Sequence, residues 1–556
     1  MKMNKIIAGI IAVCVMGFGV PYVNTVAENN SVITASAEDE ADYTVGTYEQ
    51  LTYKNYGDYI EISSCDKFLT EVVIPSEIEG LPVTSIGFSA FSNSHSLTSV
   101  KIPDSVTSIG DGAFWYCYSL ESVEIPDSVT IIEGGAFYHC DSLTSINIPD
   151  SVTSIGSLAF YECSNLTSIK IPKSVTSIGD EAFARTSWLE EKRKENPLVL
   201  VNNILIDGGT CTGDVVIPDG VTRIPTDAFN GCDSLTSVKI PDSVTSIGQY
   251  AFYECSSLTS VNIPDGVKNI ELFTFRGCSS LTSVKIPDSV TSIDEGAFYE
   301  CSSLMSINIP DSVTSILEGA FSETLWLEER QKENPLVVVN NILIDGRACK
   351  GDVVIPDSTT SIGYEAFSYS QDLTSIKIPE SVKIIRRRAF ECCNELTSVE
   401  ISDGVTTIEL GAFSICKVLT EVTIPESVTR IEDGAFSCWN LESITILNPD
   451  CDIQGYAIMD TATIYGYENS TAQAYAEKYG YNFVSLGKAP QKETATGDMN
   501  GDNSVSVADA VLLQSYILGR QELTEEQYKN ADLTGDGFVD SFDMVLLRKK
   551  IIEDNK

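Results

Sequence analysis

Residues 99–117 read SVKIPDSVTSIGDGAFWYC, and the segments at 122–140 (SVEIPDSVTIIEGGAFYHC) and 145–163 (SINIPDSVTSIGSLAFYEC) are near copies of them. The copies follow one another every 23 residues, and the pattern continues from residue 75 to residue 446. The most regular member is a proline, which Ser402 replaces once; it stands at Pro103, Pro126, Pro149, Pro172, Pro218, Pro241, Pro264, Pro287, Pro310, Pro356, Pro379 and Pro425. Self-similarity at a fixed period of this length predicts a repeat architecture rather than a single globular core.

Each copy contains two short strand-like segments. In the copy at 281–298, apolar residues stand at strand spacing in two segments, LTSVKIP (281–287) and SVTSI (289–293), and the pair Ala297–Phe298 follows. One copy is too small to bury its own apolar side chains, whereas stacked copies share a continuous core and pair their strands in parallel ladders. We therefore expect residues 75–446 to form a solenoid of short parallel β-strands with 23-residue coils.

The recurring pattern LTSVxIPxSVTSIGxxAFxxC resembles the BspA-like class of leucine-rich repeats. The resemblance covers the whole repeat region, and many copies agree with it. It implies a leucine-rich-repeat solenoid and a role as a secreted or surface-exposed bacterial interaction scaffold. It does not point to a particular ligand.

Two copies carry an insertion. After Pro172 and after Pro310 the next repeat proline comes 46 residues later, and these intervals contain WLEEKRKENPLVLVNNILIDGGTC (188–211) and WLEERQKENPLVVVNNILIDGRAC (326–349). Each predicts a charged helical turn and then a hairpin closed at a pair of asparagines, Asn202–Asn203 or Asn340–Asn341. The insertions lie 138 residues apart, which is six repeats, so we expect them to protrude at equivalent places.

The first residues predict a secretory signal peptide at 1–37. Lys2 and Lys5 precede a short apolar run, and small residues follow it. The spacing favours cleavage after Ala37, with Ala27 as the alternative. A retained membrane anchor is a further alternative, but the run is short for a bilayer span of about 20 residues.

The segments that flank the repeat differ from it in composition. Residues 38–74 are rich in tyrosine and predict an N-terminal cap, and residues 447–487 predict a C-terminal cap. Within the latter, 462–487 predicts a strand, a short helix and a closing strand. Residues 488–497 predict a polar linker to a separate domain at 498–556.

Two acidic segments, DMNGDNSVSVAD at 498–509 and DLTGDGFVDSFD at 532–543, have the spacing of calcium-binding loops. Oxygen-bearing side chains stand at positions 1, 3, 5, 9 and 12, and position 7 offers its carbonyl group, as in an EF-hand. Gly537 supplies the sharp turn at position 6, where the first loop has Asn503. The predicted ligands of two Ca²⁺ ions are Asp498, Asn500, Asp502, Ser504, Ser506, Asp509, Asp532, Thr534, Asp536, Phe538, Asp540 and Asp543.

An apolar-periodic helix follows each loop, and we expect no amphipathic helix to enter either one. From Gly497 to about Ile552 the chain resembles a type I dockerin, a small all-α calcium-binding domain that binds cohesin domains on the scaffold proteins of cellulosomes. The resemblance implies two Ca²⁺ ions and cohesin contacts from loop positions 10 and 11 and from the second helix: Val507, Ala508, Ser541, Phe542, Arg548 and Lys549. The two loop pairs differ chemically, so we expect one dominant binding orientation.

Nine cysteines share one slot of the repeat: Cys117, Cys140, Cys163, Cys232, Cys255, Cys278, Cys301, Cys393 and Cys416. Stacked coils hold equivalent side chains parallel and about 4.8 Å apart, whereas a disulfide needs inclined Cβ vectors and a dihedral angle of about 90°. We expect a column of buried thiols, with disulfides as the alternative. The slot lacks the C-x-x-C spacing and the histidine partners of a metal site.

Two other sets of equivalent residues, one polar and one aromatic, each allow two interpretations. The outward residues of the first strands run from Lys101 to Thr423, and they form either a binding face for a polar polymer or the polar side of a half-buried sheet. The aromatic residues after the repeat phenylalanine either stack on sugar rings or pack between coils: Trp115, Tyr138, Tyr161, Tyr253 and Tyr299. Their regular spacing suggests that one of the columns contacts polysaccharide or a partner protein.

The composition restricts the possible functions. A formal charge of −43 repels phosphate backbones, which argues against nucleic-acid binding. Of the two histidines, His95 and His139, the second occupies a slot that indicates a solvent-facing loop, and no Ser/His/Asp or Cys/His set is evident. We expect a secreted, non-catalytic binding or scaffolding component of a cellulosome-like assembly at the cell surface. The alternatives are an adhesin that binds a host or neighbouring-cell protein and a polysaccharide-degrading glycoside hydrolase. A glycoside hydrolase uses a pair of carboxylates, and a chain this acidic always offers some pair at a suitable spacing.

Overall fold

The computed structural model describes residues 43–459, 461–490, 496–501 and 504–554. The expected signal peptide with both cleavage sites, the start of the N-terminal cap, part of the linker, and Asp502 and Asn503 lie outside the described residues. The chain divides into two units, of which the first extends to Val175 and includes Ala184–Ser187, while the second comprises Thr176–Phe183 and the chain from Trp188 onward.

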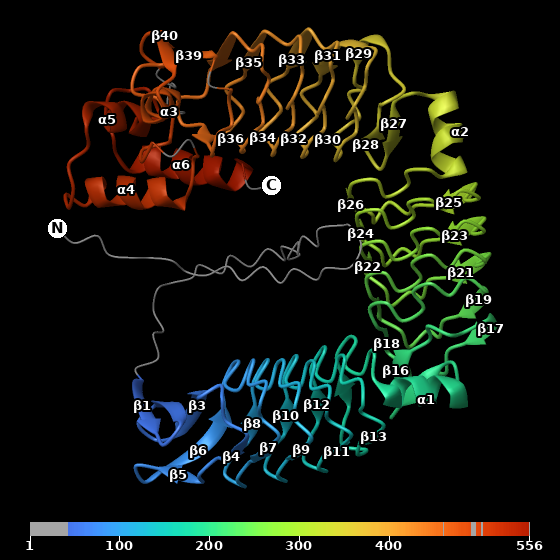
Figure 1. Cartoon of the computed structure of the whole chain (residues 1–556). Helices are drawn as coiled ribbons and strands as arrows, with labels where there is room; N and C mark the ends of the chain where they lie inside the picture. The colour runs from blue at the N-terminus through green and yellow to red at the C-terminus, as the bar shows by residue number, and fades with distance from the viewer. Residues whose placement is uncertain (1–42, 460, 491–495, 502–503, 555–556) are drawn as a thin grey trace. The chain divides into compact units, whose positions relative to one another are not determined.

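The first unit begins with an antiparallel cap and continues as a solenoid (Figure 1). In the cap, strand β2 pairs with β1 and with β3, and β3 then runs parallel to β6, which joins the cap to the coils. The strands are β1 (Thr44–Tyr48), β2 (Leu51–Asn55), β3 (Ile60–Cys65), β4 (Glu71–Val73), β5 (Glu77–Ile78), β6 (Leu81–Ile86), β7 (Ser99–Lys101), β8 (Ser108–Ile109), β9 (Ser122–Glu124), β10 (Ile131–Ile132), β11 (Ser145–Asn147), β12 (Ser154–Ile155) and β13 (Ser168–Lys170).

Each coil contributes one strand to each of two parallel ladders. Strands β4, β7 and β9 follow one another in the first ladder, and β6, β8, β10 and β12 in the second. The register joins residues 23 positions apart, for example Val100 with Val123 and Ile109 with Ile132. The predicted solenoid of 23-residue coils is therefore confirmed.

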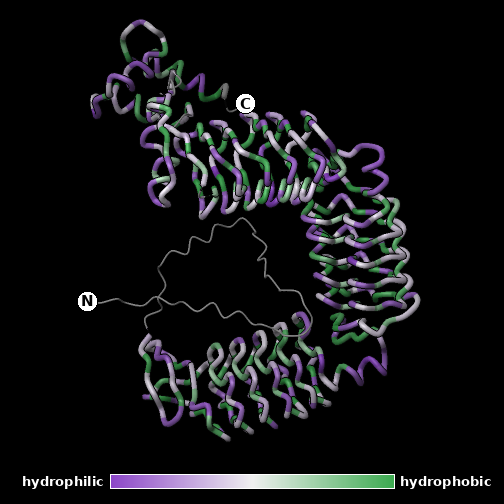
Figure 2. Tube along the Cα trace, turned by 45° about the horizontal axis from the view of Figure 1, so that its top comes forward, coloured by the Kyte–Doolittle hydropathy of each residue, from purple (hydrophilic) through white to green (hydrophobic). Residues whose placement is uncertain are grey.

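Columns of identical apolar residues fill the core. Phe91, Phe114, Phe137 and Phe160 are fully buried, and neighbouring rings stack with centroids 5.1–5.3 Å apart and nearly parallel planes. Hydrophobic and hydrophilic residues alternate along the coils (Figure 2). The repeat thus buries the same positions in every coil, as its periodicity requires.

The second unit repeats this arrangement and contains both insertions. Its solenoid strands are β14 (Ser177–Ile178), β17 (Gly213–Val216), β18 (Arg223–Ile224), β19 (Leu235–Lys239), β20 (Ser246–Ile247), β21 (Ser260–Asn262), β22 (Asn269–Ile270), β23 (Ser283–Lys285), β24 (Ser292–Ile293), β25 (Ser306–Asn308), β26 (Ser315–Ile316), β29 (Gly351–Val354), β30 (Ser361–Ile362), β31 (Leu373–Ile378), β32 (Ile384–Ile385), β33 (Ser398–Ile401), β34 (Thr407–Ile408), β35 (Glu421–Ile424), β36 (Arg430–Ile431), β37 (Ser443–Ile446) and β38 (Asp452–Ile453).

Each insertion is a helix followed by a two-stranded hairpin, as predicted. The first contains α1 (Ser187–Glu195), β15 (Val199–Val201) and β16 (Ile204–Asp207), and the second contains α2 (Leu325–Glu333), β27 (Val337–Val339) and β28 (Ile342–Asp345). The hairpins turn on asparagines with positive φ, which is 47° to 67° at Asn202, Asn203, Asn340 and Asn341.

The insertions do not simply protrude from the solenoid. Strand β28 pairs in parallel with β30 and so belongs to the second ladder. The tryptophan that opens each helix is buried, and Trp326 packs on Phe321 with ring centroids 4.9 Å apart. Each insertion is therefore a modified coil, because its apolar residues need the same core as the rest of the repeat.

The C-terminal cap confirms the expected order of strand, helix and strand. Strand β39 (Thr463–Gly466) runs parallel to β37 and to β40 (Asn482–Ser485), and α3 (Thr471–Tyr479) connects β39 with β40. The hydroxyl group of Ser470 caps the start of α3, and Gly480, with φ of 80°, ends the helix.

The last described residues form a small helical domain with helices α4 (Val507–Ile517), α5 (Glu525–Ala531) and α6 (Ser541–Asp554) around Met499, Leu513, Ala531, Met544, Leu547 and Ile551. Helices α4 and α6 follow the acidic loops, as predicted. Helix α5 leads directly into Asp532, so a short helix that the sequence analysis did not predict enters the second loop. A capping box of Thr524 and Gln527 starts this helix, and its seven residues are too few to show a helical period in the sequence. No helix of the described chain is long and apolar enough to cross a membrane.

Candidate functional site

The second acidic loop folds its carboxylates onto its own backbone. Asp532 accepts hydrogen bonds from the N–H groups of Gly535 at 2.7 Å, Asp536 at 3.2 Å and Gly537 at 2.8 Å. Asp543, at position 12, is fully buried and accepts from the N–H groups of Thr534 and Asp540. Gly537 has φ of 84°, which supports the predicted sharp turn at position 6.

The first loop has the same arrangement in its described part. Asp498 is fully buried and accepts from the N–H group of Gly501 at 2.8 Å. Asp509 is also fully buried and accepts from the N–H groups of Met499, Asn500 and Ser506 at 2.8–3.0 Å. Positions 1 and 12 of both loops are thus held in equivalent ways, whereas Asp502 lies outside the described residues.

The donor set of these loops suits a hard divalent cation. Burial opposes ionisation of Asp532, but hydrogen bonds from the Gly537 and Gly535 N–H groups outweigh it and lower the pKa of this carboxyl group. Among the ion pairs between described residues, none involves Asp532, Asp536, Asp540 or Asp543. No group of three or more His, Cys, Asp or Glu side chains in the described part already surrounds one metal position. Ionised carboxylates and carbonyl groups are nevertheless the oxygen ligands that Ca²⁺ takes, and a bound cation would relieve their mutual repulsion.

The residues expected to contact cohesin lie on the surface. Val507 is 67% exposed and Phe542 is 71% exposed, and Ala508, Ser541, Arg548 and Lys549 are exposed as well. The sequence reasoning missed Val511 and Val545, which are also exposed and stand four and three residues after Val507 and Phe542 on the same helices. Their helical spacing is the signal that places them on the same faces.

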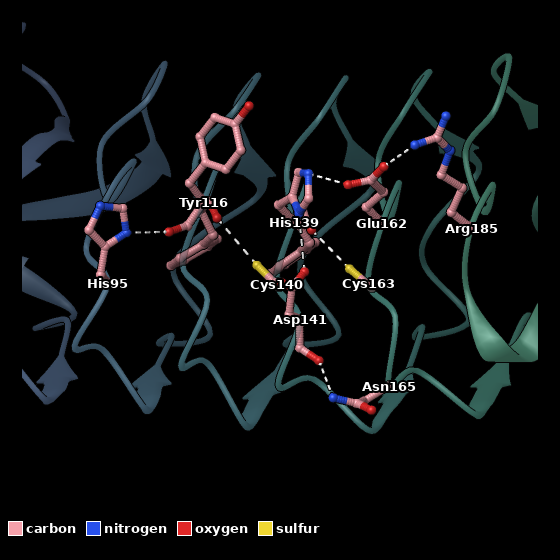
Figure 3. Close-up of polar contacts among 11 residues, drawn as sticks. His95, Tyr116, His139, Cys140, Asp141, Glu162, Cys163, Asn165 and Arg185 are labelled. Carbon is pink, nitrogen blue, oxygen red and sulfur yellow. Dashed lines mark hydrogen bonds and ion pairs between the residues drawn. The ribbon is translucent and has the colours of Figure 1, made fainter. Parts of the chain in front are cut away.

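All 15 cysteines that the structure describes are buried and carry free thiols, in agreement with the expected thiol column. The Sγ atoms donate to phenylalanine carbonyl groups of the preceding coil, as Cys140 does to Phe114 at 3.3 Å and Cys163 to Phe137 at 3.0 Å (Figure 3). Burial raises the pKa of the Cys117 thiol to about 12. The nine-cysteine column is structural, because each of its thiols is buried and donates to a backbone carbonyl group.

The aromatic column packs between coils. Tyr138 and Tyr161 stack with centroids 5.0 Å apart, and the Arg185 guanidinium lies 5.3 Å from the Tyr161 centroid. In the second unit, Arg276 lies over both Tyr253 and Tyr299. These rings therefore present mainly their edges to solvent.

The outward column of the first strands is exposed along its length. Lys101, Lys239 and Lys285 all lie at exposed positions beside buried valines. Lys377 forms an ion pair with Glu400 of the next coil. The column is the exposed polar side of the sheet.

His139 is less exposed than its slot suggested. Its Nδ1 lies 3.2 Å from an Asp141 carboxylate oxygen, its Nε2 contacts Glu162, and Glu162 also pairs with Arg185 (Figure 3). The side chain is 24% exposed, and its ring stacks on Tyr116 with centroids 5.2 Å apart. His139 therefore stands at a loop position that is only partly open to solvent, because neighbouring side chains lie against its ring.

Comparison with known proteins identifies two families. The BspA type leucine rich repeat region matches residues 63–195, 209–328 and 349–464 in six copies, and the dockerin type I domain matches residues 496–552. No match is found among curated proteins. The two family matches cover the repeat region and both acidic loops.

Several of the similar solved structures are bacterial leucine-rich repeat proteins. One is a leucine-rich repeat protein from Bacteroides ovatus ATCC 8483, with 23% identity over 80% of this chain and 99% of that chain and a TM-score of 0.24. Another is a leucine rich cell surface protein from Faecalibacterium prausnitzii A2-165, with 26% identity over 81% and 96% of the two chains and a TM-score of 0.26. A third is the T. pallidum leucine rich repeat protein, with 27% identity over 47% and 91% and a TM-score of 0.20.

Proposed function

Because the chain belongs to the BspA-type leucine-rich repeat proteins and carries a type I dockerin domain, we propose that it is a secreted binding component that docks onto a cohesin-bearing scaffold protein of a cellulosome-like assembly. Both modules are of non-catalytic binding types. The solenoid then carries the recognition surface, which contacts polysaccharide or a partner protein. The observation that supports docking most directly is the pair of equivalent acidic loops, whose carboxylates at positions 1 and 12 accept hydrogen bonds from the N–H groups of their own loop and are buried at Asp498, Asp509 and Asp543.

Two calcium ions fit this proposal. Asp498, Asn500, Asp502, Ser504, Ser506 and Asp509 would hold one, and Asp532, Thr534, Asp536, Phe538, Asp540 and Asp543 would hold the other. A bound ion supplies the positive charge that lets these carboxylates remain ionised in a compact loop. The loops order the start of α4 and α6, so calcium would organise the surface that carries Val507, Ala508, Ser541, Phe542, Arg548 and Lys549.

The domain organisation follows from the same proposal. A signal peptide at 1–37 directs export, and caps at 38–74 and 447–487 close a solenoid at 75–446. A linker at 488–497 connects it to the dockerin at 498–556. The extracellular setting agrees with the typical location of both protein families.

The test is a pull-down from the secreted fraction of a cohesin-producing bacterium with the full mature chain, in calcium and in chelator. We expect the wild type to recover a cohesin-bearing scaffold only in calcium. The double variant Asp532→Ala/Asp543→Ala should lose this recovery, whereas Asp104→Ala/Asp127→Ala, with the same loss of charge in the solenoid, should retain it. Recovery of the scaffold in chelator, or no recovery at all, would contradict calcium-dependent docking.

A further inference from the structure

Four rings of the first unit form one surface group, the aromatic–histidine cluster of His95, Tyr116, Tyr118 and His139. His95 stacks on Tyr118 with centroids 5.0 Å apart, and Tyr116 stacks on His139. The centroid of Tyr118 lies 5.6 Å from that of Tyr116 and 5.9 Å from that of His139. The cluster therefore joins three successive coils and contains both histidines of the chain.

The repeat fold does not require these rings. The slot of Tyr116 and His139 holds varied residues in other coils, most of them polar or small: Asn93, Glu162, Glu254, Gly277, Glu300, Tyr369 and Ile415. The slot of His95 and Tyr118 likewise holds Asp141, Ser164, Asp233, Ser256 and Ser279. The repeat phenylalanine beneath is fully buried whether or not a ring occupies these slots, so packing of the solenoid does not require the rings.

The slot of Tyr116 and His139 has a left-handed backbone, with φ of 58° and 56°. The same conformation recurs in other coils, with φ of 56° at Glu162, 57° at Glu254 and 58° at Ile415, so it belongs to the coil and not to the rings. In this conformation the side chain stands at the turn between the coils, and the residue type there decides what the surface presents.

The rings are not fully covered by one another. The plane of Tyr118 is tilted by 49° from that of Tyr116 and by 78° from that of His139, and the residue is 39% exposed. His95 is exposed as well, and its Nδ1 lies 3.0 Å from the Tyr116 carbonyl oxygen. Part of the Tyr118 ring is therefore accessible, in contrast to the tightly stacked rings of the column at Tyr138 and Tyr161.

Hydrogen-bond acceptors and one ion pair border the cluster. Asp141 and Glu162 both contact His139, and Arg185 pairs with Glu162 (Figure 3). Asn165 donates its amide N–H to the Asp141 carbonyl oxygen at 2.8 Å, which holds the loop that carries this carboxylate. Two carboxylates beside one arginine disfavour an anionic polymer, and the fixed acceptors suit a neutral ligand with many hydroxyl groups.

We propose that the aromatic–histidine cluster binds a neutral sugar unit of a polysaccharide chain. The apolar face of the sugar ring packs on Tyr118, and its hydroxyl groups reach the phenol group of Tyr116, the ring nitrogens of His95 and the carboxylate of Asp141. Tyrosine suits this contact because it combines an apolar ring with a polar tip. The inference rests on the proposed function of the solenoid and gives it a site and a ligand class.

Affinity electrophoresis of the full mature chain tests the cluster, with gels that contain a β-glucan, a galactomannan or an arabinoxylan, and polygalacturonate as the anionic comparison. We expect at least one neutral polysaccharide to retard the wild type and polygalacturonate to leave it unretarded. Tyr116→Asn/Tyr118→Ser introduces residues that other coils carry in these slots, and it should weaken retardation at least roughly tenfold, which corresponds to the loss of one aromatic anchor. Tyr118→Phe keeps the ring and should retain most of the binding.

The control is Tyr369→Ser, which removes a tyrosine that is 64% exposed in the slot of Tyr116 but outside the cluster. This variant should migrate like the wild type, and circular dichroism and calcium-dependent scaffold recovery should stay unchanged in all variants. Equal retardation of the wild type and the double variant would overturn the site while leaving the proposed function intact. A wild type that no neutral polysaccharide retards would overturn both the site and polysaccharide recognition by the solenoid. Loss of a captured protein in the double variant, without any sugar binding, would also overturn it.

Discussion

At the scale of the residue, the cysteine column illustrates how burial controls chemistry in this chain. Burial raises the pKa of Cys117, Cys393 and Cys451 to about 12 and that of Cys349 to about 11. The thiolate is the reactive species, so these thiols are almost entirely unreactive at neutral pH. Burial and a small thiolate fraction therefore protect these four thiols from oxidation.

We expect the native protein to react with an aromatic disulfide reagent at least roughly a hundredfold more slowly than the protein in denaturant, at pH 7 and at pH 9. A raised pKa in the folded state contributes stability that is present below the unfolded pKa of about 8.5 and is lost above it. The free energy of unfolding should therefore be flat up to about pH 8 and fall at higher pH. Rapid stoichiometric labelling of the native protein at pH 7 would contradict the buried column.

Also at this scale, two buried aspartates are neutralised by different partners. Asp207 receives two hydrogen bonds from Arg193 of α1, at 2.8 and 2.6 Å. The equivalent Asp345 pairs with Arg347 of the following loop and receives a hydrogen bond from Gln331 of α2. The arginine that pairs with the buried carboxylate thus lies on the helix in the first insertion and in the loop in the second.

Removing the arginine in the first insertion should be costly. Arg193→Ala leaves Asp207, which is 7% exposed, without its cation, and we expect the free energy of unfolding to fall by about 2–4 kcal/mol. Gln331→Ala is the matched control, with an expected loss of about 1 kcal/mol because Arg347 remains. Urea unfolding, with hydrogen exchange at each hairpin to locate the effect, measures both. Equal losses in the two variants would show that the helix contact, and not the charge, stabilises the insertion.

At the scale of the element, the two halves of the dockerin domain present different side chains for docking. Helix α4 offers Val507 and α6 offers Phe542, both well exposed. A large aromatic anchor contributes more binding energy than a valine, so Phe542→Ala should weaken cohesin binding at least roughly tenfold and Val507→Ala less than about threefold. Isothermal titration in calcium gives both affinities. Similar losses from the two variants would indicate two equivalent orientations instead of one.

Elements with a distinctive local signal could be predicted from the sequence, and those without one could not. The Asn-Asn pairs predicted both hairpins, because few residue types adopt the positive φ angles of a two-residue hairpin turn. Helix α5 escaped prediction because it is a single capped segment of seven residues. The aromatic–histidine cluster was not predicted either. It joins two different slots of the repeat across three coils, and a comparison of equivalent residues within one slot does not show that the two slots lie side by side.

At the scale of the whole molecule, the period alone was enough to predict the solenoid, because each coil repeats the contacts of its neighbours. Stability should then depend on the number of coils more than on the identity of any one. Deletion of residues 246–268 removes one complete period and joins equivalent positions, so the circular dichroism spectrum should persist with a small loss in thermal stability. Deletion of residues 246–257 shifts the register by half a coil and should abolish cooperative unfolding. Comparable behaviour of the two deletions would contradict a core built from interchangeable coils.

The exact 23-residue register also has a consequence for inheritance. Near-identical coding segments favour unequal recombination. An exchange between equivalent positions adds or removes whole coils, and every remaining side chain keeps its place in the core. The two insertions, six coils apart with matching sequences, are what the duplication of such a block would leave behind. Lineages can therefore lengthen or shorten the solenoid in whole steps, without a new fold and without a change in the dockerin domain.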